Sequence, residues 1–174
     1  MKKGISTWIG LITGLLMIAI SLAIYYYKRS FENNFEYVPY LIYIAGIVYA
    51  LNRFKSSPAD NKSFKNFFSE GFKTFIVVTL LMVVFTWIFL KANPGFQDQI
   101  VESKRESLIK DGQRTLPEIE EKMKIAKQNF ITYFTAGAIL GYLAIGSLAT
   151  VIGSLFFSQQ ESAEERRKNQ KLQK

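Results

Sequence analysis

The feature that most restricts the fold of this chain is a run from Gly4 to Tyr27 without a single charged side chain. A helix needs about 20 apolar residues to cross the hydrocarbon core of a bilayer. Three more stretches of similar character follow, at residues 37–54, 72–90 and 130–157. Each is apolar continuously rather than at alternate positions, which favours helices over barrel strands. The sequence therefore predicts an all-α membrane protein with four transmembrane helices in an up-down bundle, as one domain over residues 1–160.

Two of these stretches allow a second interpretation. The second is uncharged only from Tyr37 to Leu51, a length that also suits a re-entrant segment. Extension to Phe54 makes it a span and places Arg53 at the membrane interface. The first stretch has signal-peptide features, namely preceding lysines and the motif Ser21-Leu22-Ala23, but its apolar run exceeds the usual length of about 7–15 residues. We expect a retained first helix.

Lysine and arginine residues predict the orientation of the chain. They are in excess at the N-terminus, in the second connection and in the charged tail at residues 161–174. Cytoplasmic loops carry such an excess, so both termini are expected on the cytoplasmic side of a bacterial inner membrane. The third connection carries eight bases and seven acids between Lys91 and Asn129, and this near-neutrality suits export.

Aromatic side chains agree with this threading, because amphipathic rings collect at both membrane interfaces. The residues expected at the interfaces are Tyr25, Tyr26, Tyr27 and Trp87 on the outer side and Phe64, Phe67 and Phe68 on the inner side. The inner set has helical spacing, so its helix is expected to lie in the interface before it turns into the third span. Glu70 and Lys73 at that turn form either a local ion pair or a relay for protons or ions.

The third connection is the only substantial segment predicted outside the membrane, and we expect a helical hairpin at residues 93–129. Asn93-Pro94-Gly95 ends the preceding helix, and Asp111-Gly112 predicts a turn. Thr115 and Glu118 have the spacing of a capping box. The hairpin is either a solvated spacer or a docking surface for a partner. The candidate docking residues are Arg105, Glu106, Glu120 and Lys124.

Small residues recur in the first and fourth stretches. Such patterns allow helix backbones to approach closely in lipid. The predicted packing positions are Ser6, Gly10, Gly14, Gly137, Gly141, Gly146 and Gly153. They serve either packing within the monomer or self-association.

The composition excludes several kinds of chemistry. The chain has no cysteine and no histidine, which removes thiol, disulfide and imidazole chemistry. Phosphate-binding loops, nucleophile elbows and dinucleotide fingerprints are also missing. We therefore expect no enzyme activity, catalytic residue, metal or cofactor. The net charge of +8 does not point to nucleic acid, because the bases lie beside apolar spans.

Two segments resemble a known family. They are Lys62-Ser63-Phe64-Lys65-Asn66-Phe67-Phe68-Ser69-Glu70-Gly71-Phe72-Lys73, which leads into the third span, and Ala92-Asn93-Pro94-Gly95-Phe96, which follows it. With the charged hairpin and the glycine-rich last helix, they resemble the "domain of unknown function 4199" proteins, small inner-membrane proteins typical of Bacteroidota. The resemblance implies the fold and the location and supplies no catalytic residues. Relatives are often encoded beside a membrane glycosyltransferase, which implies a place in a glycolipid pathway.

The sequence thus predicts a structural or accessory subunit of the inner membrane. Its expected partners are membrane lipids and either another membrane or envelope protein or a second copy of the chain, bound through the hairpin and the basic cytoplasmic face. The alternative is an oligomeric translocator of a lipid or lipid-linked sugar. Such a protein needs a hydrophilic groove at membrane depth, for which few polar residues are available.

Overall fold

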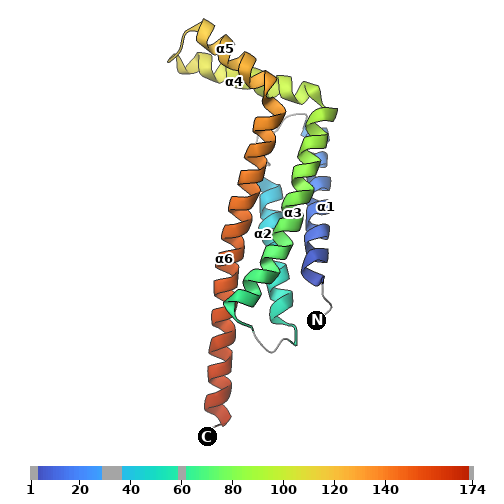
Figure 1. Cartoon of the computed structure of the whole chain (residues 1–174), viewed down its shortest axis with the longest axis vertical. Helices are drawn as coiled ribbons and strands as arrows, with labels where there is room; N and C mark the ends of the chain where they lie inside the picture. The colour runs from blue at the N-terminus through green and yellow to red at the C-terminus, as the bar shows by residue number, and fades with distance from the viewer. Residues whose placement is uncertain (1–3, 29–36, 59–61, 173–174) are drawn as a thin grey trace. The chain divides into compact units, whose positions relative to one another are not determined.

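The computed structural model describes residues 4–28, 37–58 and 62–172. The predictions about the lysines before Gly4 and about the charge balance of the first connection lie outside the described residues. The described part contains six helices, α1 to α6, with the bounds Ile5–Lys28, Val38–Lys55, Phe64–Ala92, Pro94–Asp111, Leu116–Gln128 and Phe130–Leu172 (Figure 1). The chain divides into two compact units, one of Met1–Met82 with Gly141–Lys174 and the other of Val83–Leu140.

Three of the described helices are long and apolar enough to cross a membrane, namely Ile5–Tyr27 within α1, the whole of α3, and α6. They indicate a multi-pass membrane protein. Helix α2 is not among them, because its 18 residues end in Asn52, Arg53 and Lys55, which lower its mean hydropathy. The structure therefore supports three of the four predicted spans, and the second span stays a prediction.

The first unit packs α1, α2, the first part of α3 and the second part of α6 side by side (Figure 1). Its core is formed by fully buried side chains on each helix, among them Met17, Tyr43, Ile47, Leu51, Phe67 and Val78. Three of these side chains, Tyr43, Ile47 and Leu51, lie on one face of α2, so this face is at the centre of the core. The opposite face of α2, with Leu41, Ile44, Val48 and Tyr49, is apolar and exposed.

Consecutive helices of the first unit run in opposite directions. Ser6 at the start of α1 is hydrogen-bonded to Glu70 near the start of α3, so these two helices begin at the same end. Phe54 near the end of α2 lies edge-on to Phe67 of α3, with ring centroids 4.9 Å apart. Phe67 also stacks on Phe157 of α6 at 5.9 Å. The same end of the unit therefore holds the starts of α1 and α3, the end of α2 and the last part of α6.

Helix α3 differs from the prediction at its beginning. It is one uninterrupted helix from Phe64 to Ala92, so no break separates an interfacial segment from a span. Phe67, predicted at the membrane interface, is fully buried between Phe54 and Phe157. Phe67 therefore packs against other helices and does not face the outside of the unit, because aromatic spacing alone cannot say whether a ring meets lipid or another helix. Its depth at the membrane interface stays a prediction.

Helix α6 continues well past the predicted end of the fourth stretch at residue 157. It reaches Leu172, and its last part lies in the segment predicted as a charged tail. The residues from 159 onward are mostly Gln, Glu, Ala, Arg and Lys, without glycine or proline. These are strong helix formers, so nothing in the local sequence ends the helix at the edge of the apolar run.

The second unit contains the predicted hairpin, formed by α4 and α5. Gly112 ends α4 in the left-handed conformation with φ 62°, which glycine adopts without steric cost. The capping box at the start of α5 is present, and the Thr115 amide donates to the Glu118 carboxylate at 2.9 Å. The small core of this unit includes Phe96, Ile119, Met123 and Phe130. Only Asn129 separates α5 from α6.

Candidate functional site

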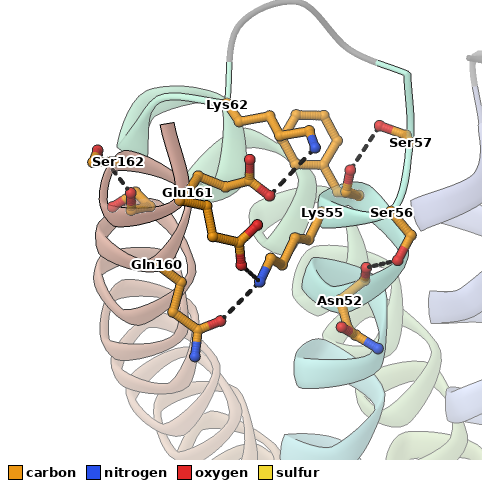
Figure 2. A network of polar contacts seen from close by, with 11 residues as sticks. Asn52, Lys55, Ser56, Ser57, Lys62, Gln160, Glu161 and Ser162 are labelled. Carbon is orange, nitrogen blue, oxygen red and sulfur yellow. Dashed lines mark hydrogen bonds and ion pairs between the residues drawn. The ribbon is translucent and has the colours of Figure 1, made fainter. Parts of the chain in front are cut away.

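The charged end of the first unit joins α6 to the connection between α2 and α3 (Figure 2). Lys55 Nζ lies 3.1 Å from Gln160 Oε1 and 3.0 Å from Glu164 Oε1. Lys62 Nζ lies 3.3 Å from Glu161 Oε1. These residues are about a hundred positions apart in the chain, and the parallel packing of α2 and α6 brings them together. The apolar part of α6 is followed by a few charged turns. The ion pairs hold these turns against the end of α2 and the connection that follows it.

Electrostatics at this end follow from those pairs. The hydrogen bond and the charge of Lys55 lower the pKa of Glu164 below the usual value of a glutamate. The Glu164 side chain remains half exposed, so water screens much of this attraction. The network therefore positions α6 and adds little to the overall stability.

A second polar cluster lies beside it, around Glu70. This carboxylate is mostly buried and accepts hydrogen bonds from Ser6 Oγ at 2.5 Å and from Lys73 Nζ at 2.7 Å. Thr74 Oγ1 donates to the carbonyl of Ser6 at 3.1 Å. Both carboxylate oxygens have a partner, and the cluster joins the start of α1 to α3. The contacts favour the local ion-pair interpretation of Glu70 and Lys73 over a relay.

Most of the predicted small residues lie where another helix is close. A Cβ added to Gly10 would lie 2.8 Å from the Thr74 carbonyl, and one on Gly14 would lie 2.7 Å from Leu81. Gly153 lies against Leu51 in the same way, at 2.6 Å. Such positions exclude larger side chains unless the neighbouring helix shifts.

Two predicted packing positions behave differently. A Cβ on Gly137 would meet nothing within 4 Å in the described part of the chain, and one on Gly141 would meet only the Tyr40 hydroxyl at 4.0 Å. Gly137 therefore makes no close helix contact with the residues that the structure describes. Conversely, Gly46 against Thr13 and Gly71 against Thr150 are close contacts that the sequence analysis missed. An isolated glycine in a helical stretch was the signal that could have found them.

Tyr43 is a buried polar residue that the sequence analysis also missed. Its hydroxyl lies 3.1 Å from Thr79 Oγ1 and donates toward the carbonyls of Phe75 at 3.3 Å and Tyr142 at 3.2 Å. Gly146 leaves the space that this hydroxyl occupies. Tyr43 thus connects α2 to both α3 and α6. A tyrosine in the middle of an apolar run, rather than at its edge, was the available signal.

The predicted docking residues of the hairpin fall into two groups. Arg105 on α4 bonds to Glu120 on α5, with Nη2 2.6 Å and Nε 2.8 Å from the same carboxylate oxygen. These contacts raise the pKa of Arg105, mainly through the Glu120 hydrogen bond. Glu106 and Lys124 are exposed and pair with no described residue. Arg105 and Glu120 therefore hold the hairpin together, while Glu106 and Lys124 are free to meet a partner.

The other predicted interfacial aromatics lie on the surface of their units. Tyr26 and Tyr27 are exposed, Tyr25 is half-buried, and Phe64 and Trp87 keep large exposed areas. Lys91 Nζ lies 3.9 Å from the centre of the Trp87 ring, a cation–π contact. Phe68 is half-buried, with its ring 6.0 Å from that of Phe64.

The described residues contain no group of three or more acidic side chains that could hold a metal ion. The described residues form long apolar helices, and their ion pairs lie at one end of the first unit and in the hairpin. These features define the class, a multi-pass α-helical membrane protein. Residues 9–159 match the family described as "Protein of unknown function (DUF4199)", and the chain belongs to that family. No curated protein and no solved structure matches the chain.

Proposed function

We propose that this protein is a non-catalytic accessory subunit of the bacterial inner membrane that docks a partner through its hairpin and its basic cytoplasmic face. The observation that carries the proposal is the hairpin itself. Its two helices are fixed to each other by the Arg105–Glu120 bond and the capping box, yet Glu106 and Lys124 stay exposed and unpaired among the described residues. A preorganised charged surface of this kind suits an electrostatic interface.

We also propose that α2 crosses the membrane as the second of four spans. Because α1 and α3 begin at the same end of the first unit, the chain must return between them, and α2 is the helix that makes this return. Its exposed face is apolar along its length, which costs little in lipid and would be costly in water. Arg53 and Lys55 follow the apolar part, as expected for residues at the cytoplasmic interface.

The orientation rests on where positive charges collect. The second connection and the last part of α6 are basic and lie at the same end of the first unit, so both suit the cytoplasm. The hairpin follows an odd number of spans, which puts it on the extracytoplasmic side. Two docking surfaces on opposite sides would let one small protein contact an envelope partner and a cytoplasmic one.

The translocator alternative gains no support from the buried polar residues. Tyr43 and Thr79 are hydrogen-bonded to each other, and Gly146 brings α6 close to Tyr43. Gly71 likewise brings α3 close to the Thr150 side chain of α6. These side chains therefore lie in tight contacts between helices, where a translocator would need them to face a hydrophilic path.

Copurification from native membranes in a mild detergent, followed by mass spectrometry, tests the docking proposal. The double reversal Glu106→Lys with Lys124→Glu keeps the net charge and the hairpin contacts, and it should reduce the yield of the envelope partner. Replacing residues 97–127 with a flexible linker should remove that partner while the spans stay folded. If both variants keep every partner of the wild type, the hairpin is only a spacer.

A further inference from the structure

A recess lies at the charged end of the first unit, between the start of α1 and the end of α2. Its volume is about 230 Å³. The residues that line it are Ile5, Ser6, Ala50, Arg53, Phe54, Ser56, Ser57 and Pro58. Arg53, Ser56 and Pro58 are exposed, so the recess is open at the surface of the unit. One part of its wall is cationic and hydroxylic, and the other part, with Ile5, Ala50 and Phe54, is apolar.

Arg53 is the residue that gives this recess a chemical preference. The neighbouring lysines Lys55, Lys62 and Lys73 each have a carboxylate partner. Arg53 has no ion pair with any residue that the structure describes. The nearby carboxylate of Glu70 already accepts from Ser6 and from Lys73. The guanidinium is therefore without an acidic partner in the described part of the chain and is available to attract an anion.

The chemistry of the wall favours a phosphodiester. A guanidinium donates two parallel hydrogen bonds to phosphate oxygens, which is why arginine recognises phosphate better than a point charge does. The volume is below the range of about 300–1,000 Å³ of sites that enclose a whole drug-sized molecule. It suits a headgroup phosphate with its glycerol, whose acyl chains stay outside in the bilayer.

The position of the recess favours a lipid as the source of that phosphate. Arg53 comes two residues after the apolar run that ends at Leu51, and this position is the level of the lipid headgroups. Trp8, one turn after Ile5, is 67% exposed, and Tyr49, next to Ala50, is 54% exposed. Such rings face the membrane interface in a protein of this class. Anionic lipids of the cytoplasmic leaflet attract basic residues at this depth.

We propose that this recess binds the headgroup of one anionic phospholipid, with Arg53 as the phosphate ligand and the apolar wall against the glycerol. Lipid binding is a further function beyond docking. It rests on the proposed function only for the cytoplasmic location of this end of the first unit. Loss of the hairpin partner would leave the lipid site intact, and loss of lipid binding would leave hairpin docking intact.

The test is native mass spectrometry of the full-length protein, titrated in detergent with phosphatidylglycerol or with phosphatidylcholine. The wild type should retain one phosphatidylglycerol in preference to phosphatidylcholine. Arg53→Gln should weaken this binding by about tenfold or more, the usual effect of losing a charge-assisted hydrogen bond. The matched control is Lys65→Gln, which removes one exposed positive charge from the same end outside the recess and should change nothing.

Further variants make the result decisive. Ser57→Phe fills the recess while Arg53 stays, and it should also weaken the binding. Thermal unfolding of each variant in detergent checks that the fold is kept.

Equal losses of phosphatidylglycerol binding in Arg53→Gln and Lys65→Gln would show a diffuse charge effect and overturn the site. Equal retention of the two lipids would overturn it too, and displacement of phosphatidylglycerol by millimolar inorganic phosphate would identify a site for free phosphate instead.

Discussion

At the scale of single residues, the first unit depends on pairs of a small side chain and a large one. Gly146 faces the Tyr43 hydroxyl and the Phe75 ring, and Gly153 faces Leu51. Tyr43 in turn satisfies its hydroxyl with groups of α3 and α6. In lipid, helices gain no hydrophobic drive from association, so close packing and hydrogen bonds of this kind carry more of the stability.

Gly146→Leu should therefore destabilise the protein strongly. A Cβ at this position would collide with the Tyr43 hydroxyl and would lie 2.9 Å from Phe75 Cδ2, where a buried tyrosine has no room to move. Overpacking of this kind costs about 1–3 kcal/mol. Unfolding of the purified protein in detergent measures the effect.

Gly137→Leu is the matched control, because a Cβ there meets no described atom within 4 Å. It should leave the unfolding transition unchanged. An equal cost at Gly137 would show that this glycine packs against a second copy of the chain, and size-exclusion chromatography with light scattering would then reveal a change in oligomeric state.

At the scale of elements, the hairpin and the last part of α6 are the segments that local contacts must hold in place. Helix α5 has 13 residues, and isolated helices shorter than about 12–15 residues are marginal in water. The capping box, the Arg105–Glu120 bond and the buried side chains of Ile119 and Met123 compensate for this. The last part of α6 relies instead on Lys55 and Lys62.

The capping box predicts a pH dependence of the start of α5. Hydrogen bonds from Thr115 lower the pKa of Glu118 below its usual value of 4.5. The carboxylate therefore stabilises the hairpin above pH 4.5, and this contribution is lost as the pH falls through the lower folded pKa. Hydrogen exchange of the first-turn amides, corrected for intrinsic rates, should show reduced protection in acid.

Glu118→Gln separates this effect from the titration of the other carboxylates. Glutamine retains an acceptor for the Thr115 amide but does not titrate in this range. The acid-induced loss of protection should therefore be smaller in Glu118→Gln than in the wild type. Identical pH profiles for the two proteins would contradict the assignment to Glu118.

The Lys55–Glu164 pair predicts a local effect on α6. Lys55→Glu should speed proteolysis or hydrogen exchange of residues 158–172, because it places like charges side by side. It should hardly change the global unfolding transition, since the pair is partly exposed. Adding Glu164→Lys should restore protection by reversing the pair. Failure of the double variant to recover would show that Lys55 acts through Gln160 or through another contact.

At the scale of the whole molecule, the number of crossings decides which surfaces meet the cytoplasm. With four spans, both termini and the second connection share one side, and the hairpin lies on the other. With a re-entrant α2, the second connection and the C-terminus would lie outside with the hairpin inside. These two arrangements differ at every position after α2, so labelling can distinguish them.

Single cysteines offer a direct measurement, because the native chain contains none. In intact cells with a permeable outer membrane, a membrane-impermeant maleimide should label Gln113→Cys and spare Asp60→Cys and Gln170→Cys. Labelling after cell lysis controls for the reactivity of each cysteine. Labelling of positions 60 and 170 with sparing of 113 would overturn the proposed topology.

The sequence by itself determined the properties that depend on neighbours along the chain. The long apolar helices, the hairpin with its breaks at Asn93 and Gly112, and the capping box at Thr115 all follow from local composition and turn chemistry. Local interactions fix such features because the backbone groups and side chains involved are only a few residues apart. The Glu70–Lys73 ion pair, at a spacing of i and i+3, belongs to the same group.

Only the tertiary structure decided which side chain meets which across helices. Phe67 is buried although its spacing suits an interface, Gly137 faces open space although its spacing suits packing, and Arg105 binds Glu120 instead of staying free. The rotation of each helix about its axis sets these contacts, and in an apolar span almost every face carries similar residues. Periodicity then holds little information about rotation, so the partners of Tyr43, Lys55 and Gly146 emerge only when the helices are packed.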